Sequence, residues 1–330
     1  MTALDHALGS LYGLALGDAL GMPTQSMSAQ EILADYGPIR QFVAAGPRQV
    51  IAAGMEAATI TDDTEQAVML GELLVAGAGE VDSAAFAHAL LAWERSMEAK
   101  GSLDLLGPST KRAVERILEG VPQDEAGRFG STNGAAMRIA PVGIARRPDP
   151  VKRFLSAVAQ ASVVTHNTSL GMASAAAVGM AVSVGVEGGS VEDAVRGGVR
   201  AAVLGDRLGH RVAGAKIGAR IPWAIELLRS TPSAQRPRVV DEIIGTSVAS
   251  QESVVAAFAI LAVLRDPWEA MCFAATVGGD TDTMAAIIGA VLGAVVGADA
   301  LPADAVAQVR CVNDLDLEPL ARGLLEVRGS

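Results

Sequence analysis

Apolar residues recur every three or four positions along most of this chain, which is the spacing of one buried face of an α-helix. The clearest such stripe consists of Phe86, Leu90, Trp93 and Met97. Two helix starts can also be recognised, because Ser190 and Asp193 have the spacing of a capping box and Asp266-Pro267 places a proline where first helical turns favour it. Alternating runs typical of strands are almost absent. The pattern predicts an all-α protein of about a dozen helices.

The two longest apolar stretches lie at residues 170–186 and 283–298. Both are diluted by small residues and fall short of the roughly 20 strongly apolar residues that a membrane-spanning helix needs. They are predicted to be buried core helices. The amino-terminal residues also lack the basic segment and apolar core of a signal peptide. We therefore expect no membrane partner.

Composition adds to this picture of tightly packed helices. Half of the residues are apolar but only 3% are aromatic, and small side chains let helix backbones approach closely. The exposed turns predicted at residues 146–150 and 230–237 are too short to mark a domain boundary. The sequence therefore predicts one domain over residues 1–330, in which the first and last thirds share a site.

The net charge and the cysteines indicate which partners and which cellular location to expect. The chain has a net charge of −11 and a pI near 4.9, so it offers no basic field that would attract nucleic acid or an anionic membrane. Neither is expected as a partner. Cys272 and Cys311 are far apart and have no paired spacing, which favours free thiols in a reducing cytoplasm.

Two short polar runs, residues 61–64 and 278–283, stand directly ahead of stretches predicted to be helices. They carry carboxylate and hydroxyl oxygens without His or Cys, a donor set that suits Mg²⁺ or Mn²⁺. Because the runs are about 220 residues apart, only the fold could bring them together around two metal ions. Helix capping by Thr and Asp is the alternative. Capping needs one such residue, however, and adjacent carboxylates repel unless a cation offsets their charge.

Three further segments place polar residues beside glycines or helix starts, at residues 13–25, 130–138 and 165–168. The first is expected to deliver Asp18 and Gln25 to a turn, and the second precedes a helix whose free amides could hold an anion. The third contains His166, for which a substrate donor and a helix cap are equally good interpretations. Taken singly, each segment is more typical of a turn than of a binding site.

In their order along the chain, these motifs resemble those of the ADP-ribosylglycohydrolase family, whose members include dinitrogenase reductase-activating glycohydrolase. The resemblance rests on residues 13–25, 61–64, 106–108, 133–143, 165–166, 252–253 and 278–283. It implies an all-α fold with a single compact orthogonal multi-helix domain. It also implies a hydrolase that cleaves the N- or O-glycosidic bond of ADP-ribosyl conjugates or related ribosides.

The resemblance further implies a binuclear Mg²⁺ or Mn²⁺ centre, at which a polarised water attacks the anomeric carbon. The metal ligands carried over by position are Thr61, Asp62, Asp63, Asp280, Asp282 and Thr283. Asp62, Asp63 and Asp282 are the candidate catalytic residues. The candidate substrate-binding residues are Gln25, Ser131, Thr132, Asn133, Gly134, Ala135 and His166.

The chain departs from the family pattern in two places. Many members carry Glu where this chain has Gln25, and an amide cannot take a proton from water at neutral pH. The base must then be a carboxylate such as Asp62, Asp63 or Asp282. The Ser131-Thr132 loop lacks the extra glycine and the aromatic residue of members that act on modified proteins, which favours a smaller ribosyl substrate.

The alternatives are a nucleoside-type hydrolase of small ribosyl compounds and a non-catalytic protein that binds ADP-ribose. The second is disfavoured because all six metal-ligand positions are retained.

Overall fold

The structure is a computed structural model that describes residues 1–99 and 106–329. These residues form eighteen α-helices and no β-strand, which confirms the all-α prediction. The α-helices are α1 (Ala3–Gly21), α2 (Ala29–Asp35), α3 (Asp62–Ala76), α4 (Ser83–Ala99), α5 (Pro108–Leu118), α6 (Gln123–Ala126), α7 (Gly134–Met137), α8 (Ala140–Ala145), α9 (Val151–His166), α10 (Ser169–Val186), α11 (Val191–Gly205), α12 (Ile217–Ser230), α13 (Arg236–Val239), α14 (Ser250–Val263), α15 (Pro267–Ala274), α16 (Thr281–Val296), α17 (Ala303–Asn313) and α18 (Glu318–Gly329). Short 3-10 turns at Met22–Thr24, Ser233–Gln235 and Ala298–Ala300 and a π turn at Val240–Ile244 join them.

The strongest helix signals of the sequence correspond to helices of the structure. The apolar stripe at residues 86–97 lies in α4, and the capping box of Ser190 and Asp193 begins α11. Asp266 caps α15, which ends at Ala274. The number of helices exceeds the expected dozen because one-turn helices such as α6, α7 and α13 are too short to show a period. The prediction of one domain over residues 1–330 stays a prediction.

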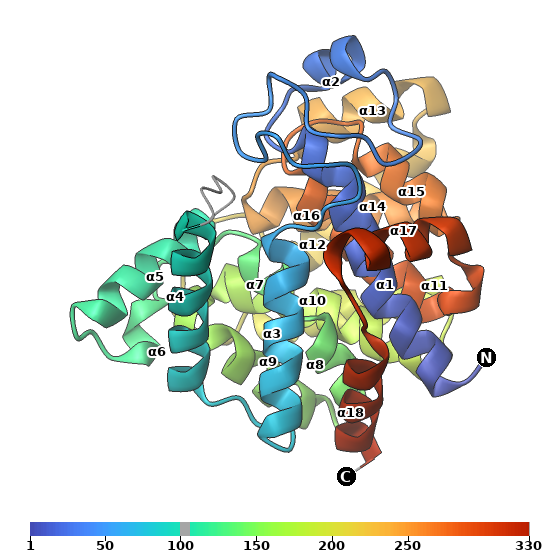
Figure 1. Cartoon of the computed structure of the whole chain (residues 1–330). Helices are drawn as coiled ribbons and strands as arrows, with labels where there is room; N and C mark the ends of the chain where they lie inside the picture. Colours follow the sequence, from blue (N-terminus) through green and yellow to red (C-terminus); the bar gives the residue numbers. More distant parts are fainter. Residues whose placement is uncertain (100–105, 330) are drawn as a thin grey trace.

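The first and sixteenth helices pack together more extensively than any other pair of described elements (Figure 1). They run antiparallel, and glycines let their backbones touch. A Cβ atom added to Gly13 would lie 2.1 Å from the carbonyl oxygen of Gly289, far inside van der Waals contact. At the end of α1, a Cβ on Gly21 would lie 2.4 Å from the Cα of Asp282. This contact places the end of α1 against the start of α16, where the second polar run lies.

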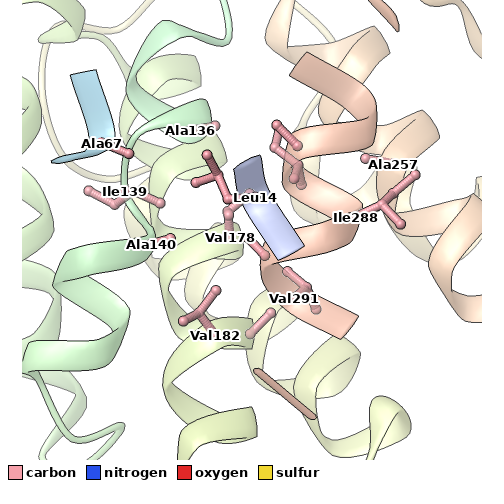
Figure 2. Packing of buried hydrophobic residues seen from close by; sticks show 14 of the residues in the cluster. Leu14, Ala67, Ala136, Ile139, Ala140, Val178, Val182, Ala257, Ile288 and Val291 are labelled. Atoms are coloured by element: carbon pink, nitrogen blue, oxygen red, sulfur yellow. The ribbon is translucent and has the colours of Figure 1, made fainter. Parts of the chain in front are cut away.

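The core is built from the apolar faces that surround this pair. Figure 2 shows Leu14 of α1 beside Val178 of α10, and Ile288 and Val291 of α16 nearby. Among the described helices, α10 alone is long and apolar enough to cross a membrane, but 94% of its residues are buried inside the protein. It is therefore the central core helix that its composition predicted.

A glycine turn holds the chain segment after α1 beside the second polar run. Gly278 and Gly279 have φ angles of 87° and 79°, which favour glycine. The amide of Gly279 donates to the carbonyl oxygen of Met27 at 2.9 Å, and the amide of Ser26 donates to the carbonyl oxygen of Gly279 at 2.7 Å. This short pairing positions the neighbouring Gln25 next to Asp280.

Candidate active site

A cavity of about 260 Å³ lies where the starts of α3, α5, α7 and α16 meet the segment after α1. Of the residues singled out from the sequence, the cavity is lined by Gln25, Asp62, Asp63, Thr132, Asn133, Gly134, Asp280, Asp282 and Thr283. The others, which do not line it, are Thr61, Ser131, Ala135 and His166. The remaining lining residues include Ile51, Leu106, Pro108, Met137 and Val248. The fold thus brings both polar runs and the polar turn before α7 to one pocket.

The two polar runs form one side of the pocket, which we call the carboxylate wall: Asp62, Asp63, Asp280 and Asp282. The hydroxyl of Thr283 donates to Oδ2 of Asp63 at 3.3 Å, which joins the runs directly. Oδ1 of Asp63 is buried and accepts no hydrogen bond within the protein. A buried acceptor without an internal partner fits a site at which a cation binds.

The electrostatics of the carboxylate wall also favour a site for a cation. Burial raises the pKa of Asp63 well above its usual value, and the neighbouring carboxylates of Asp282 and Asp62 raise it further. Burial also raises the pKa of Asp280, although hydrogen bonds from Asn133 and Thr283 act against this. Charges of one sign gathered in a pocket are stabilised by a cation.

Helix capping explains only part of the first run. The hydroxyl of Thr61 accepts from the amide of Asp63 at 3.4 Å and caps α3. The side chain of Asp280, the N-cap residue of α16, makes no capping hydrogen bond. Capping therefore does not account for the carboxylates of Asp62, Asp63 and Asp282.

Asp18 is a buried member of the site region that the sequence did not single out for a role. It was expected in a turn, but it lies in the last turn of α1. Its carboxylate accepts from the hydroxyl of Thr61 at 2.7 Å, from the hydroxyl of Thr64 and from both backbone amides. Burial raises the pKa of Asp18 to about 6 despite these bonds. Asp18 thus anchors the start of α3 and holds the Thr61 hydroxyl outside the cavity lining.

The donors of the carboxylate wall fit hard divalent cations. They are oxygen atoms only, as Mg²⁺ and Mn²⁺ prefer. Within residues 1–99 and 106–329, no three His, Cys, Asp or Glu side chains stand close enough together to hold a metal ion by themselves. Mg²⁺ commonly keeps several waters and takes few protein carboxylates, so a wall of separated carboxylates suits this ion better than a closed cage would.

The other side of the pocket, which we call the neutral wall, consists of Thr132, Asn133 and Gly134. The amide nitrogen of Asn133 donates to Oδ2 of Asp280 and, at 2.9 Å, to the hydroxyl of Ser253. Its backbone amide donates to the carbonyl oxygen of Val248 at 3.0 Å. The neutral wall is therefore held rigidly against the carboxylate wall.

His166 supports this wall from behind. Its side chain is fully buried, and Nε2 lies 3.0 Å from the hydroxyl oxygen of Thr132. Burial and the nearby guanidinium of Arg138 lower the pKa of His166 well below 6.5, so the imidazole is neutral. A substrate in the cavity would be reached through Thr132 and not by the imidazole itself.

Gln25 lies at the pocket with an available donor. Its side chain is 6% exposed, and its amide nitrogen Nε2 is buried without a hydrogen-bond partner in the protein. Gln25 therefore can donate a hydrogen bond to a molecule in the cavity, which a carboxylate could not do.

The sequence pattern of the ADP-ribosylglycohydrolase family matches this chain over residues 1–330. The chain belongs to the ADP-ribosylglycohydrolase family. As a member of this family it is a glycosyl hydrolase. A solved structure described as an ADP-ribosylglycohydrolase-related protein complex superimposes with a TM-score of 0.71 at 25% identity, and covers 98% of both chains.

Individual relatives in the ADP-ribosylglycohydrolase family extend the comparison. The uncharacterized protein YegU of Escherichia coli is 31% identical over 98% of this chain and 97% of its own length. The ADP-ribosyl-[dinitrogen reductase] glycohydrolase of Rhodospirillum rubrum is 32% identical over 54% of this chain and 57% of its own length. ADP-ribosylarginine hydrolase Tri1 of Pseudomonas putida is 34% identical over 50% of this chain and 42% of its own length.

Proposed function

We propose that this chain hydrolyses the glycosidic bond between ADP-ribose and an acceptor, with two Mg²⁺ or Mn²⁺ ions held at the carboxylate wall. The observation that supports this most is the meeting of the two polar runs in one cavity, across from the hydrogen-bonding groups of the neutral wall. The names of the Rhodospirillum rubrum and Pseudomonas putida relatives support an ADP-ribosylated substrate, with arginine as the first acceptor to test.

Asp62, Asp63, Asp280, Asp282 and Thr283 would hold the metal ions, and Thr61 was also expected among the ligands. When bound, such ions supply a polarised water and a fixed place for the hydroxyls of the ribose. The family resemblance is consistent with the oxygen-only donor set of the wall.

The protein groups around the cavity have separate roles in the reaction. Oδ1 of Asp63 accepts the proton of the attacking water, because this buried oxygen has no internal hydrogen-bond partner and because burial and the neighbouring carboxylates raise the pKa of Asp63. The hydroxyl of that water ends on the anomeric carbon, and the proton ends on the nitrogen or oxygen of the leaving acceptor. Thr132 and Gln25 donate hydrogen bonds to oxygen atoms of the ribosyl unit, and the side-chain oxygen of Asn133 accepts one from a ribose hydroxyl.

A small riboside is the second candidate substrate, and the size of the cavity favours it. The cavity of about 260 Å³ lies below the roughly 300 to 1,000 Å³ that is usual for ligand sites. A ribosyl group fits within it, whereas the nucleotide part of an ADP-ribosyl conjugate would extend toward the surface. A small ribosyl compound would be enclosed more completely.

The test is an incubation of the protein with Mn²⁺ or Mg²⁺ and three substrates: an ADP-ribosylated arginine peptide, an ADP-ribosylated serine peptide and a nucleoside mixture. Chromatography separates released ADP-ribose from released free base. We expect metal-dependent release of ADP-ribose that Asp63→Asn abolishes and that Asp304→Asn, an exposed aspartate outside the pocket, retains. Release of free base alone would contradict the proposal and show that the substrate is a small riboside. Binding of ADP-ribose without turnover of any substrate would replace it by a binding function.

A further inference from the structure

A continuous chain of hydrogen bonds runs behind the pocket and joins its two walls. Oδ2 of Asp62 accepts from Nε2 of Gln66 at 2.8 Å, and Oε1 of Gln66 accepts from Nη1 of Arg138 at 2.9 Å. The chain continues through Thr165 and His166 to Thr132. We call these six residues the Arg138 relay. Its four inner members, Gln66, Arg138, Thr165 and His166, have no exposed surface.

Arg138 sets the direction of the first arm. A guanidinium can only donate hydrogen bonds. The side-chain oxygen of Gln66 must therefore face Arg138, which leaves the amide nitrogen to face Asp62. In this orientation Gln66 donates to the carboxylate of Asp62 and cannot turn its oxygen toward it. The carboxylate is thereby held in one rotamer at the start of α3.

The same rule sets the direction of the second arm. Nη2 of Arg138 donates to the hydroxyl oxygen of Thr165, so the proton of that hydroxyl is available to Nδ1 of His166 at 2.8 Å. A neutral imidazole that accepts at Nδ1 carries its proton at Nε2. Nε2 then donates to the hydroxyl oxygen of Thr132, 3.0 Å away. The hydroxyl proton of Thr132 is left to point into the cavity that this residue lines.

We propose that Arg138 is a positioning residue that polarises both walls of the pocket, by holding Asp62 as an acceptor-only carboxylate and by making Thr132 a hydrogen-bond donor toward an oxygen atom of the substrate. Its action on catalysis rests on the proposed hydrolase function. The direction of the hydrogen bonds does not, because it follows from the contacts alone.

A purely structural role for Arg138 is the competing account. The guanidinium lies over the ring of Phe86, 4.9 Å from the ring centre, and its Nε has no hydrogen-bond partner in the protein. A buried cation is costly, and apolar side chains of similar volume often stabilise a core as well or better. If Arg138 only filled space, the state of His166 and the binding of substrate would not depend on it.

The first measurement is the tautomer of His166, read from the nitrogen chemical shifts of a protein with ¹⁵N-labelled histidine. We expect the form with the proton on Nε2 in the wild type. Thr165→Val removes the hydroxyl while keeping the shape, and we expect it to mix the two tautomers, whereas Thr165→Ser keeps the wild-type form. A wild-type imidazole with its proton on Nδ1 would overturn the proposal. No turnover is needed, so this result stands apart from the fate of the proposed function.

The second measurement separates the two arms by kinetics. Thr165→Val should raise the KM, or the Kd of ADP-ribose, about tenfold, the effect of about one lost hydrogen bond, and change kcat little. Gln66→Met disturbs only the arm that ends at Asp62, so it should lower kcat and change KM little. Arg138→Lys, which keeps the charge but not the forked donors, should show both effects. Folded Thr165→Val and Gln66→Met variants with wild-type tautomer, KM and kcat would show that the relay is structural only.

Discussion

The two walls of the pocket differ in how their polar atoms are satisfied. In the neutral wall, Asn133 donates to Ser253 and Asp280, and the hydroxyl of Thr132 is bonded to a buried imidazole. In the carboxylate wall, Oδ1 of Asp63 has no internal partner, and burial and the neighbouring carboxylates raise the pKa of Asp63. The polar side chains of the neutral wall are satisfied within the protein, whereas the gathered carboxylates of the other wall suit the cations that we propose.

This difference shows which part of the site is already organised before a ligand binds. Hydrogen bonds that exist before a ligand arrives cost nothing when it binds. Gathered carboxylates, in contrast, lower the stability of the protein until their charge is offset. Substitutions that exchange the character of the two walls are therefore the sharpest way to test the comparison.

The largest effect is expected for Asp63→Asn, which neutralises the central carboxylate without changing its size. Turnover should fall about 100-fold to 1,000-fold, because the proton acceptor is lost. In the presence of a chelator, however, the free energy of unfolding should rise by about 1 kcal/mol, because a buried charge among like charges is removed. Turnover assays and urea unfolding measure the two effects. An active Asp63→Asn, or one that is less stable without metal, would contradict this account of the carboxylate wall.

The converse change, Asn133→Asp, would extend the carboxylate wall into the neutral one. The new carboxylate would face Asp280, to which Asn133 now donates. We expect the free energy of unfolding to fall by about 2 kcal/mol without metal, because a hydrogen bond becomes a repulsion. Mn²⁺ should recover part of this loss. Turnover should fall about 100-fold because the new negative charge displaces the neighbouring Asp280 and alters the carboxylate wall. Unchanged stability in a chelator would show that the two side chains do not face each other as described.

The contrast between the walls also explains what could be predicted from sequence. The residues of the carboxylate wall lie in two contiguous runs of the sequence ahead of apolar helices, so the residue types alone were enough to predict this part of the site. The supporting residues Gln66 and Thr165 lie in α3 and α9, and Arg138 lies in the turn after α7. Helical period indicates burial but not which polar atoms meet. One signal was available: Gln66 follows Asp62 by four residues, which places both on one face of α3.

The position of Asp18 is a second feature that the sequence did not predict. It was expected in a turn because glycines surround it, yet α1 continues through Gly17 to Gly21. Those glycines serve the close contact with α16, so packing between helices overrides their low helix propensity. No local pattern distinguishes a glycine that ends a helix from one that allows another backbone to approach.

His166 supplies a smaller test, through the pH dependence of stability. The imidazole is neutral in the folded protein because burial and Arg138 lower its pKa, whereas the unfolded chain binds a proton below about pH 6.5. Its contribution to stability is therefore fully present above that pH and is lost as the pH falls below it, by at most about 1.4 kcal/mol per pH unit. In a chelator, the free energy of unfolding of His166→Gln should fall less than that of the wild type between pH 7.5 and 5.5. Parallel curves would contradict the buried neutral imidazole.

The smallest effect is expected at Gln25. Its buried Nε2 can donate one hydrogen bond to a bound ribosyl group, so Gln25→Ala should lower turnover about threefold to tenfold. Gln25→Glu also removes this donor, so it should lower turnover by a similar factor. Measured pH–rate profiles of both variants check this. A loss of more than about 100-fold in Gln25→Ala would give Gln25 a part in proton transfer and remove that part from the carboxylate wall.

The central claim is that the carboxylate wall holds two divalent cations. Calorimetric titration of the metal-stripped protein with Mn²⁺ tests it most directly, because the stoichiometry counts the ions without relying on turnover. We predict two Mn²⁺ per chain for the wild type and for Asp304→Asn, and fewer for Asp282→Asn. A wild type that binds no Mn²⁺, or an Asp282→Asn that still binds two with unchanged affinity, would contradict the claim.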